Sequence, residues 1–204
     1  MRVLIVHYSL SGHTHFLAEA IEKGAQEVKN SIVDMRRVPE SLSQEEIERR
    51  GADEFQRSFM TIPLCTMDDL RNADAIFFGA PTYLGCVCAQ MQQFLESASR
   101  LWKERALVGK VGSAFTSSAS QHGGQEVALL GIHASMLHLG MITVGLPYTF
   151  QEQMRIDEVT GVTPFGVATI TGQRGERKPS ENELNAARFQ GEHVTRIASK
   201  LAER

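Results

Sequence analysis

The segment from Tyr8 to Thr14 (Tyr-Ser-Leu-Ser-Gly-His-Thr) carries the residue types in this chain that are best suited to chemistry. It follows the apolar run Val3–Val6 and precedes a helical pattern, so we expect a strand that ends in a hydroxyl-rich turn and opens a helix. Such a turn offers backbone N–H groups, hydroxyls and the positive end of a helix dipole to an anion. We therefore interpret residues 9–14, called the 9–14 turn below, as an anion-binding turn.

The 9–14 turn contains neither lysine nor arginine, which separates it from other phosphate loops. The dinucleotide fingerprint G-x-G-x-x-G and the P-loop G-x-x-x-x-G-K-[ST] are both absent from the sequence. A phosphate bound here would be held by neutral donors, which suits the tail of flavin mononucleotide (FMN) better than a phosphoryl group that is transferred. The alternative is a plain N-cap, in which a serine or threonine closes the first helix.

Two further loops, residues 79–86 and 116–125, are rich in glycine, hydroxyl and other small residues. In an open parallel sheet, ligands bind beyond the carboxyl ends of the strands, so we expect both loops to meet the 9–14 turn. A flat aromatic ligand needs close backbone approach, amide donors and an apolar surface to stack on. Tyr83 and Leu84 are the candidate stacking residues.

The composition limits the class of protein. The 204 residues carry a formal net charge of -3, and 42% of them are hydrophobic, which fits one globular domain over residues 1–204. The charge supplies no broad basic field for nucleic acid, and no apolar run approaches the ~20 residues of a membrane helix. No secretion signal is recognised, so we expect a cytoplasmic protein without nucleic-acid or membrane partners. Cys65, Cys86 and Cys88 lack the spacing of a disulfide framework or a zinc site, and we predict no metal.

Short apolar runs alternate with helical patterns along the chain. The runs do not alternate with polar residues, as expected of strands buried on both faces, and they lie at 3–6, 32–33, 75–78, 111–115, 141–144 and 167–170. One helical pattern is the apolar stripe Val127, Leu130, Ala134, Leu137 and His138, and Ser180 and Glu183 have the spacing of a capping box before the last helix. The pattern predicts an α/β fold, with a doubly wound parallel sheet and helices on both faces.

Two excursions interrupt this alternation, at about residues 39–66 and 145–166. The first is charged and bounded by prolines, and we expect a short exposed helix within it. The second is predicted to be a loop insertion, after which the strand Gly166–Ile170 re-enters the sheet. Irregular segments of this length inside a compact domain tend to be functional or interfacial.

Several motifs together resemble a known family. Besides the 9–14 turn they are Arg37-Val38-Pro39-Glu40, Phe78-Gly79-Ala80-Pro81-Thr82, Leu101-Trp102, Gly123-Gly124-Gln125-Glu126, His138-Leu139-Gly140-Met141, Thr163-Pro164-Phe165-Gly166 and the tail from Pro179 to Glu192. In this order they are similar to the WrbA family of NAD(P)H:quinone oxidoreductases. The resemblance covers nearly the whole chain and includes both excursions.

The resemblance implies a flavodoxin-like fold with a five-stranded parallel sheet, bound FMN, NADH or NADPH as co-substrate, a small-molecule quinone as acceptor, and a homotetramer. The family's FMN positions map onto Ser9, Leu10, Ser11, Gly12, His13, Thr14, Pro81, Thr82, Tyr83, Leu84, Ser117, Ser118, Ala119, Ser120, Gln121, Gly123 and His138. Its substrate positions map onto Ser11 and Trp102. No side chain is predicted to be catalytic, because the flavin carries the redox step.

The chain departs from the family mainly at the ring and substrate ends of the expected site. The family usually has an aromatic residue where this chain has Ser11, Arg-Phe in place of Tyr83-Leu84, and Asn in place of Cys86. The third loop is one residue longer, and a histidine pair is reduced to His138-Leu139. The phosphate end is therefore matched more closely than the rest.

Other interpretations of the same residues stay open. A flavodoxin-like carrier of single electrons, or an FMN-binding interaction protein without nicotinamide turnover, would use the same cofactor site. His138 could instead be a packed histidine on a helix, and Trp102 could be a core residue.

Overall fold

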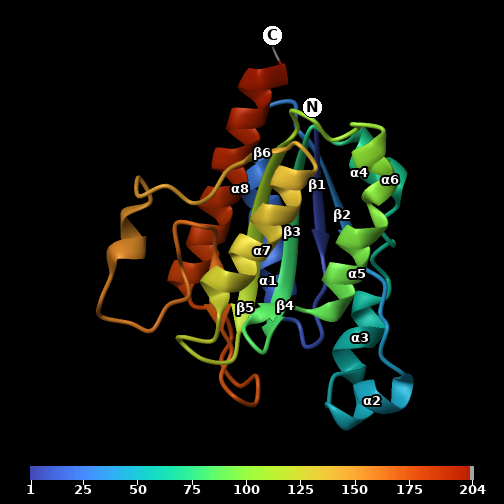
Figure 1. Cartoon of the computed structure of the whole chain (residues 1–204). Coiled ribbons are helices and arrows are strands. Elements are labelled where there is room, and N and C mark those ends of the chain that lie inside the picture. Colours follow the sequence, from blue (N-terminus) through green and yellow to red (C-terminus); the bar gives the residue numbers. More distant parts are fainter. Residues whose placement is uncertain (203–204) are drawn as a thin grey trace.

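A mainly parallel β-sheet forms the centre of the structure, a computed structural model that describes residues 1–202 (Figure 1). The strands are β1 (Arg2–His7), β2 (Ile32–Arg37), β3 (Ala75–Tyr83), β4 (Cys86–Val87), β5 (Val111–Ser118), β6 (Ile142–Thr143) and β7 (Ala168–Ile170). Five of them run in the order β2-β1-β3-β5-β6 with parallel pairing throughout. This is the doubly wound order of flavodoxin-like folds, and the predicted fold class is confirmed.

The fifth position of the sheet is shared by two short strands. β6 pairs with Val111 and Gly112 of β5, whereas β7 pairs with the segment from Thr116 to Ser118 further along the same strand. Between them the chain leaves the sheet and forms the 3-10 helix η1 (Gln151–Met154), within the orange segment of Figure 1. This segment falls within the stretch 145–166 that was predicted as an insertion, and the strand after it begins at Ala168.

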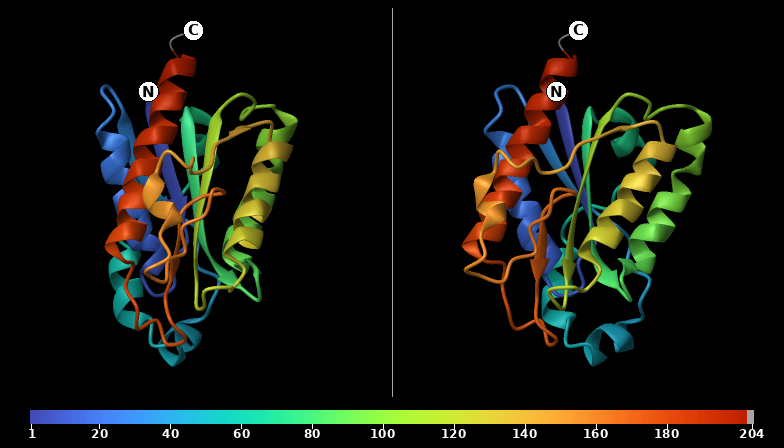
Figure 2. Two further views of the ribbon diagram at one scale, coloured as in Figure 1. Left: turned by 90° about the vertical axis from the view of Figure 1, so that its left-hand side faces the viewer. Right: turned by 60° about the vertical axis from the view of Figure 1, so that its left-hand side comes forward.

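Helices cover both faces of the sheet (Figure 2). One face carries α1 (His13–Gln26) and α8 (Glu181–Ala202), and the other carries α4 (Met67–Asn72), α5 (Ala89–Ser97), α6 (Ser99–Lys103) and α7 (Gln125–His138). Alternate residues of β1 point to opposite faces of the sheet. Val3 and Ile5 pack in the hydrophobic cluster under α1 and α8, and Leu4 and Val6 pack in the cluster on the face that carries α4 to α7. Burial on both faces explains the unbroken apolar run. No helix within residues 1–202 combines the length and apolar character needed to cross a bilayer.

Two glycines let α1 and α8 approach closely. A Cβ on Gly24 would lie 1.8 Å from the carbonyl oxygen of Arg188, and a Cβ on Gly191 would lie 2.2 Å from that of Ile21. Both obstacles are backbone atoms, which side-chain rotation cannot move. The glycines in these two helices therefore set the distance between them.

The predicted apolar stripe of α7 turns outward. Val127, Leu130 and Leu137 are exposed by 59%, 47% and 62%, whereas Ala128, Leu129, Ile132 and Met136 form the buried face. The apolar stripe of an amphipathic helix normally faces the core, but the stripe named from the sequence is not the buried one, because α7 is apolar on both sides and periodicity alone does not select between them. The helix thus keeps an apolar face that nothing in residues 1–202 covers.

The excursion at 39–66 contains two helices, α2 (Gln44–Arg49) and α3 (Asp53–Phe59), rather than one short exposed helix. Ser43 caps α2 by accepting a hydrogen bond from Glu46 N–H. Ile47 and Phe59 are buried, so the segment packs onto the body of the protein. In Figure 1 the two helices lie beside the carboxyl ends of the strands. The segment thus holds one more helix than expected, and although most of it is exposed, it is attached to the body of the protein by these buried side chains.

Replacement of Gly191 by alanine tests the close contact between α1 and α8. Alanine in a helix gains about 1 kcal/mol over glycine, but the clash with a backbone oxygen forces overpacking of about 1–3 kcal/mol or more. We expect Gly191→Ala to lower the free energy of unfolding, measured by urea denaturation. The matched control is Gly131→Ala in α7, where the new Cβ meets only Val87 Cγ2 at 3.5 Å and no loss is expected. Equal effects of both changes would contradict the packing argument.

Candidate functional site

The three predicted loops meet at the carboxyl edge of the sheet and enclose a cavity of about 350 Å³. Its size lies in the range of small-molecule sites. The predicted residues that line it are Ser9, Leu10, Ser11, His13, Thr14, Pro81, Thr82, Tyr83, Ser117, Ser118 and Ala119. Two segments that the sequence did not indicate complete the lining, namely Arg50 and the stretch from Thr171 to Gly175.

The helix α1 begins at this cavity without a side-chain cap. Its N-cap residue is Gly12, with φ of 97°, and no side chain bonds the first-turn N–H groups. The hydroxyl of Ser9 instead accepts a hydrogen bond from Gly12 N–H at 3.1 Å. The alternative of a serine or threonine N-cap is therefore wrong, and the first turn of α1 keeps N–H donors for an anion.

The hydroxyls of two loops meet beside this helix start. Thr14 Oγ1 lies 2.9 Å from Ser117 Oγ, and both residues are almost fully buried. This contact joins the 9–14 turn to the end of β5. It places two neutral hydroxyl groups next to the free N–H groups of α1.

The excursion helix α3 supports the 9–14 turn. Gln56 is buried and donates through Nε2 to the carbonyl oxygens of Ser9 and Leu10, at 2.8 Å each. Phe55 packs against Gly12 so closely that a Cβ there would lie 3.2 Å from its ring. In the sequence these residues belong to a polar, charged stretch, which gives no local signal that they buttress the turn.

The second loop is a hairpin between β3 and β4. Thr82 pairs with Val87 and Tyr83 with Cys86, and the tip at Leu84 has φ of 49° with a fully exposed side chain. Tyr83 lines the cavity, and the guanidinium of Arg50 lies 6.0 Å from its ring centroid. Burial raises the pKa of Tyr83, with Arg50 opposing the shift, so the phenol is neutral near neutral pH.

The third loop is held by its own polar contacts. Ser118 Oγ donates to the carbonyl oxygen of Ser120 at 2.8 Å, and Thr82 Oγ1 donates to that of Gly123 at 3.2 Å. Gln121 instead lines a second cavity of about 510 Å³, next to the start of α7. Among the predicted cofactor residues that do not line the first cavity, Gly12, Ser120 and Gly123 bond residues that do, whereas Leu84 is fully exposed and Gln121 lies apart from it.

A fourth wall comes from the loop after β7, residues 171–177. The imidazole Nε2 of His13 bonds the carbonyl oxygen of Gly175 at 3.1 Å, which attaches this loop to the 9–14 turn. Burial lowers the pKa of His13, and the bond to Gly175 opposes that shift. The sequence alone did not reveal this wall, since a glycine- and arginine-containing turn near the C-terminal helix resembles an ordinary exposed connection.

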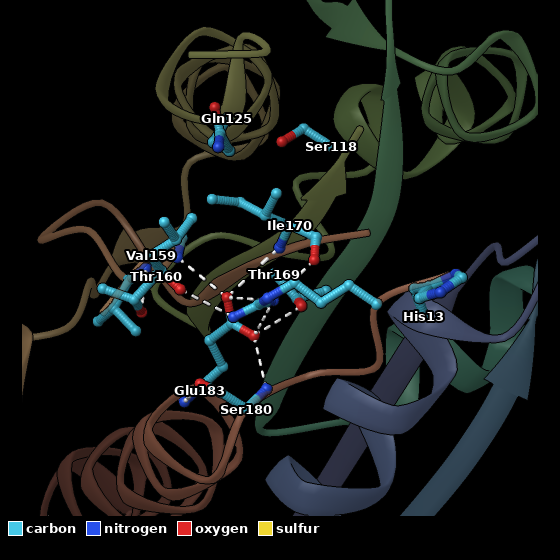
Figure 3. A network of polar contacts seen from close by, with 12 residues as sticks. His13, Ser118, Gln125, Val159, Thr160, Thr169, Ile170, Ser180 and Glu183 are labelled. Atoms are coloured by element: carbon cyan, nitrogen blue, oxygen red, sulfur yellow. Dashed lines mark hydrogen bonds and ion pairs between the residues drawn. The ribbon is translucent and has the colours of Figure 1, made fainter. Parts of the chain in front are cut away.

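The buried carboxylate of Glu183 anchors that wall (Figure 3). Glu183 is 0% exposed, and its carboxylate is surrounded by donors. It accepts hydrogen bonds from the backbone N–H groups of Gly161, Ile170 and Ser180. It also accepts hydrogen bonds from Thr169 Oγ1 and, at 2.9 Å, from the guanidinium of Arg177. The bond from Ser180 and the return bond from Glu183 N–H to Ser180 Oγ form the predicted capping box. The same carboxylate thus joins α8, β7, the end of the insertion and the 171–177 loop.

His138 and Trp102 do not line the cavity that the other predicted residues share. They line a separate groove of about 540 Å³ between α7 and the α5–α6 segment. His138 ends α7, about 20 Å along the helix axis from its first residue, which lies at the carboxyl edge of the sheet. Within one chain, neither residue therefore reaches a ligand in the first cavity. Trp102 is 57% exposed, so the alternative that it is a core residue is wrong.

The donor set of the first cavity fits an anionic, flat ligand. The lining includes hydroxyls, amides and two arginines, Arg50 and Arg174, but no carboxylate. The start of α1 supplies N–H groups at one part of the wall, and Pro81 and Tyr83 supply flat surfaces at another. The residues present therefore suit FMN, with its phosphate at the start of α1.

The base of the 9–14 turn contains a stacked histidine pair. His7 Nε2 and His15 Nδ1 lie 3.0 Å apart, with ring centroids separated by 5.2 Å, and Phe55 and Phe59 pack around them. Burial, together with the neighbouring His15, lowers the pKa of His7 to about 3. Burial also lowers the pKa of His15, while Glu19 opposes that shift. The packing therefore requires neutral imidazoles.

Comparison with known proteins identifies the family of the chain. The sequence profile of the NADPH-dependent FMN reductase family matches residues 1–153. A protein of Geotalea daltonii named NAD(P)H dehydrogenase (quinone) is 56% identical over 98% of both chains, and one of the same name from Geobacter sulfurreducens is 54% identical over 98% of this chain and 99% of its own. The fold defines a flavodoxin-like protein, and its main cavity has a lining that suits a flat, anionic ligand. The chain belongs to the NADPH-dependent FMN reductase family.

Solved structures show the same fold. The flavodoxin, WrbA-like protein from Agrobacterium tumefaciens superposes with a TM-score of 0.67 at 24% identity, covering 98% of this chain and 97% of the other. A flavodoxin from the domain Archaea gives a TM-score of 0.62 at 22% identity, with 98% and 99% covered. The resemblance to the WrbA family that the motifs indicated is confirmed by the matches taken together.

The histidine pair predicts acid sensitivity of the folded state. In the unfolded chain His7 takes up a proton near the ordinary histidine pKa of 6.5, whereas in the folded protein its pKa is about 3. Between these values the unfolded state binds more protons, so the free energy of unfolding falls as the pH falls, by up to about 1.4 kcal/mol per pH unit. We expect His7→Gln to flatten this dependence in urea unfolding series. The exposed His122→Gln is the control, and a slope that His7→Gln leaves unchanged would contradict the assignment.

Proposed function

We propose that this protein is an FMN-dependent NAD(P)H:quinone oxidoreductase. The observation that carries the proposal is the start of α1, which faces a hydroxyl-lined cavity of small-molecule size without a side-chain cap. Relatives over 50% identical along nearly the whole chain bear the name NAD(P)H dehydrogenase (quinone). Bound FMN would supply the hydride-accepting and hydride-donating chemistry that the side chains of this site lack.

The side chains bind and orient rather than react. Thr14, Ser9 and Ser11 supply hydroxyls around the α1 start, and Ser11, which the resemblance places in the substrate site, is the exposed one of the three. Gln56 holds the turn in shape by its bonds to Ser9 and Leu10, which preorganises the free N–H groups for the phosphate. Tyr83 and Pro81 form a wall of the cavity on which the ring system of bound FMN would lie.

One cavity serves both substrates in this proposal. The turn at 9–14 is the only phosphate motif that the sequence offers, so no second dinucleotide site separates nicotinamide from quinone. The nicotinamide must then leave before the quinone enters, and initial-rate plots at several quinone concentrations should be parallel. We also propose that the chain is one flavodoxin-like domain that works in the cytoplasm, where the free thiols of Cys65, Cys86 and Cys88 stay reduced.

The direct test of this function is an absorbance experiment. Purified protein reconstituted with FMN is expected to be yellow, to bleach in one two-electron step when NADPH or NADH is added anaerobically, and to regain its colour with a quinone. A stable blue semiquinone with no response to either nicotinamide would instead identify a carrier of single electrons. A yellow protein that turns over no quinone would identify an FMN-binding interaction protein. Either result would contradict the proposal.

We infer further that the protein self-associates, with a tetramer as the form that the family resemblance implies. Val127, Leu130 and Leu137 give α7 an exposed apolar face, and Trp102 extends it across the groove to α6. Exposed apolar areas of this kind mark association sites. His138 and Trp102 lie too far from the cavity of their own chain, so we propose that they face the cavity of a second copy.

Replacement of Leu137 by aspartate tests this assembly. A charge on this apolar face should shift the protein to a lower mass in sedimentation equilibrium, while the cavity of each chain keeps its own lining. Quinone reductase activity should fall with the mass. The control is Ile156→Asp, which changes a 99% exposed residue on the insertion. A wild-type protein that is monomeric, or a monomeric variant with full activity, would contradict the inference.

A further inference from the structure

The 171–177 loop is a closed unit with a fixed neck. At its ends, Arg177 N–H donates to the carbonyl oxygen of Thr171 at 2.8 Å, and Thr171 N–H donates to that of Ser118 at 2.8 Å. Inside it, Gly175 N–H donates to the carbonyl oxygen of Gly172 at 3.2 Å. Since both ends are bonded to each other and to β5, the tip is held in a defined position.

The neck is secured by the ion pair between Arg177 and Glu183. Arg177 donates through Nη1 to Glu183 and to the carbonyl oxygen of Ile170 at 2.7 Å, and through Nη2 to that of Val159 at 2.8 Å. Glu183 is fully buried, so this arrangement is far less screened than a surface pair (Figure 3). The closed loop is therefore presented on a rigid base.

The tip of the loop lies against the 9–14 turn. His13 bonds the carbonyl oxygen of Gly175, and a Cβ on Gly175 would lie 3.1 Å from the imidazole. Arg174 is the residue directly before Gly175 and lines the cavity with Gly172 and Gln173. Arg174 is thus placed at the α1 end of the cavity, where the phosphate is expected.

The two arginines of the cavity differ in what already binds them. Arg50 bonds Glu46 through Nε at 2.8 Å and Nη2 at 2.7 Å, and it lies over the Tyr83 ring. Arg174, by contrast, forms no side-chain hydrogen bond or ion pair with any residue between 1 and 202; only its backbone N–H is engaged, with Glu176 at 2.8 Å. Of the two arginines that line the cavity, Arg174 is therefore the one whose guanidinium is not paired with a carboxylate within residues 1–202.

We propose that Arg174 is the phosphate-recognising cation that the 9–14 turn itself lacks, presented by the closed 171–177 loop. This inference rests on the proposed FMN site and adds its charge selectivity. A guanidinium matches phosphate oxygens in geometry and charge, so it discriminates a flavin that carries a phosphate from one that does not. The site then prefers FMN over riboflavin, which has the same ring system, and its FMN affinity decreases with salt.

The experiment compares flavin affinities by quenching of flavin fluorescence. We expect Arg174→Gln to weaken FMN binding at least about tenfold, as for loss of a hydrogen bond to a charged group, and to leave riboflavin binding unchanged. Arg174→Lys should restore part of the FMN affinity, since it keeps the charge without the planar fork. Lys178→Gln is the matched control, because it removes one charge just past the same loop from an exposed residue that does not line the cavity.

Each other outcome has a distinct meaning. If the wild-type protein binds no FMN, the proposed function fails together with the inference. If the wild type binds FMN and Arg174→Gln binds it equally well, or loses FMN and riboflavin alike, the role of Arg174 is wrong while the proposed function stands. An Arg174→Gln variant with unchanged flavin affinity and a raised KM for NADPH would assign the residue to the nicotinamide substrate and would also overturn the inference.

Discussion

The start of helix α1 is the constraint on which the rest of the site depends. Strand β1 is buried on both faces and ends at His7, and a short turn connects it to α1. The N-cap of α1 is a glycine with left-handed backbone conformation, and no side chain caps the helix. Such a start leaves backbone donors and the positive helix end unpaired in the protein. This arrangement is stable where a bound anion accepts hydrogen bonds from these N–H groups. The hydroxyls of Ser9, Thr14 and Ser117 lie around the helix start and offer further hydrogen bonds to such an anion.

The segments that depart from the plain alternation of strands and helices build the walls around this start. The excursion at 39–66 holds the turn through Gln56 and brings Arg50 to Tyr83. The split of the fifth strand position lets the chain return as β7, and the loop after it closes the cavity from the other side. Glu183 ties this second wall to the sheet, so a residue of the last helix helps to shape a site that begins at the first.

The sequence predicted those parts of the molecule that local patterns encode. The strand at Val3–Val6 and the helix start at the 9–14 turn are encoded by nearby residues, so they could be predicted without knowledge of the rest of the fold. The three loops converge because the carboxyl ends of parallel strands lie at one edge of the sheet. Arg50, Gln56 and Arg174 were missed because their neighbours are polar, and only the fold brings them to the cavity. The stripe of α7 named from the sequence is not the buried one, because both sides of the helix are apolar. His138 was placed with the flavin by resemblance, whereas the groove that it lines belongs to the opposite end of α7.

Amide hydrogen exchange at the start of α1 tests the central claim most directly. Peptides covering residues 9–17 would be followed by mass spectrometry with and without saturating FMN. If the phosphate accepts hydrogen bonds from the first turn, exchange at His13, Thr14 and His15 slows on FMN binding, and slows much less with riboflavin at equal occupancy. Unchanged exchange at these amides in a protein that has bound FMN would place the phosphate elsewhere and contradict the account.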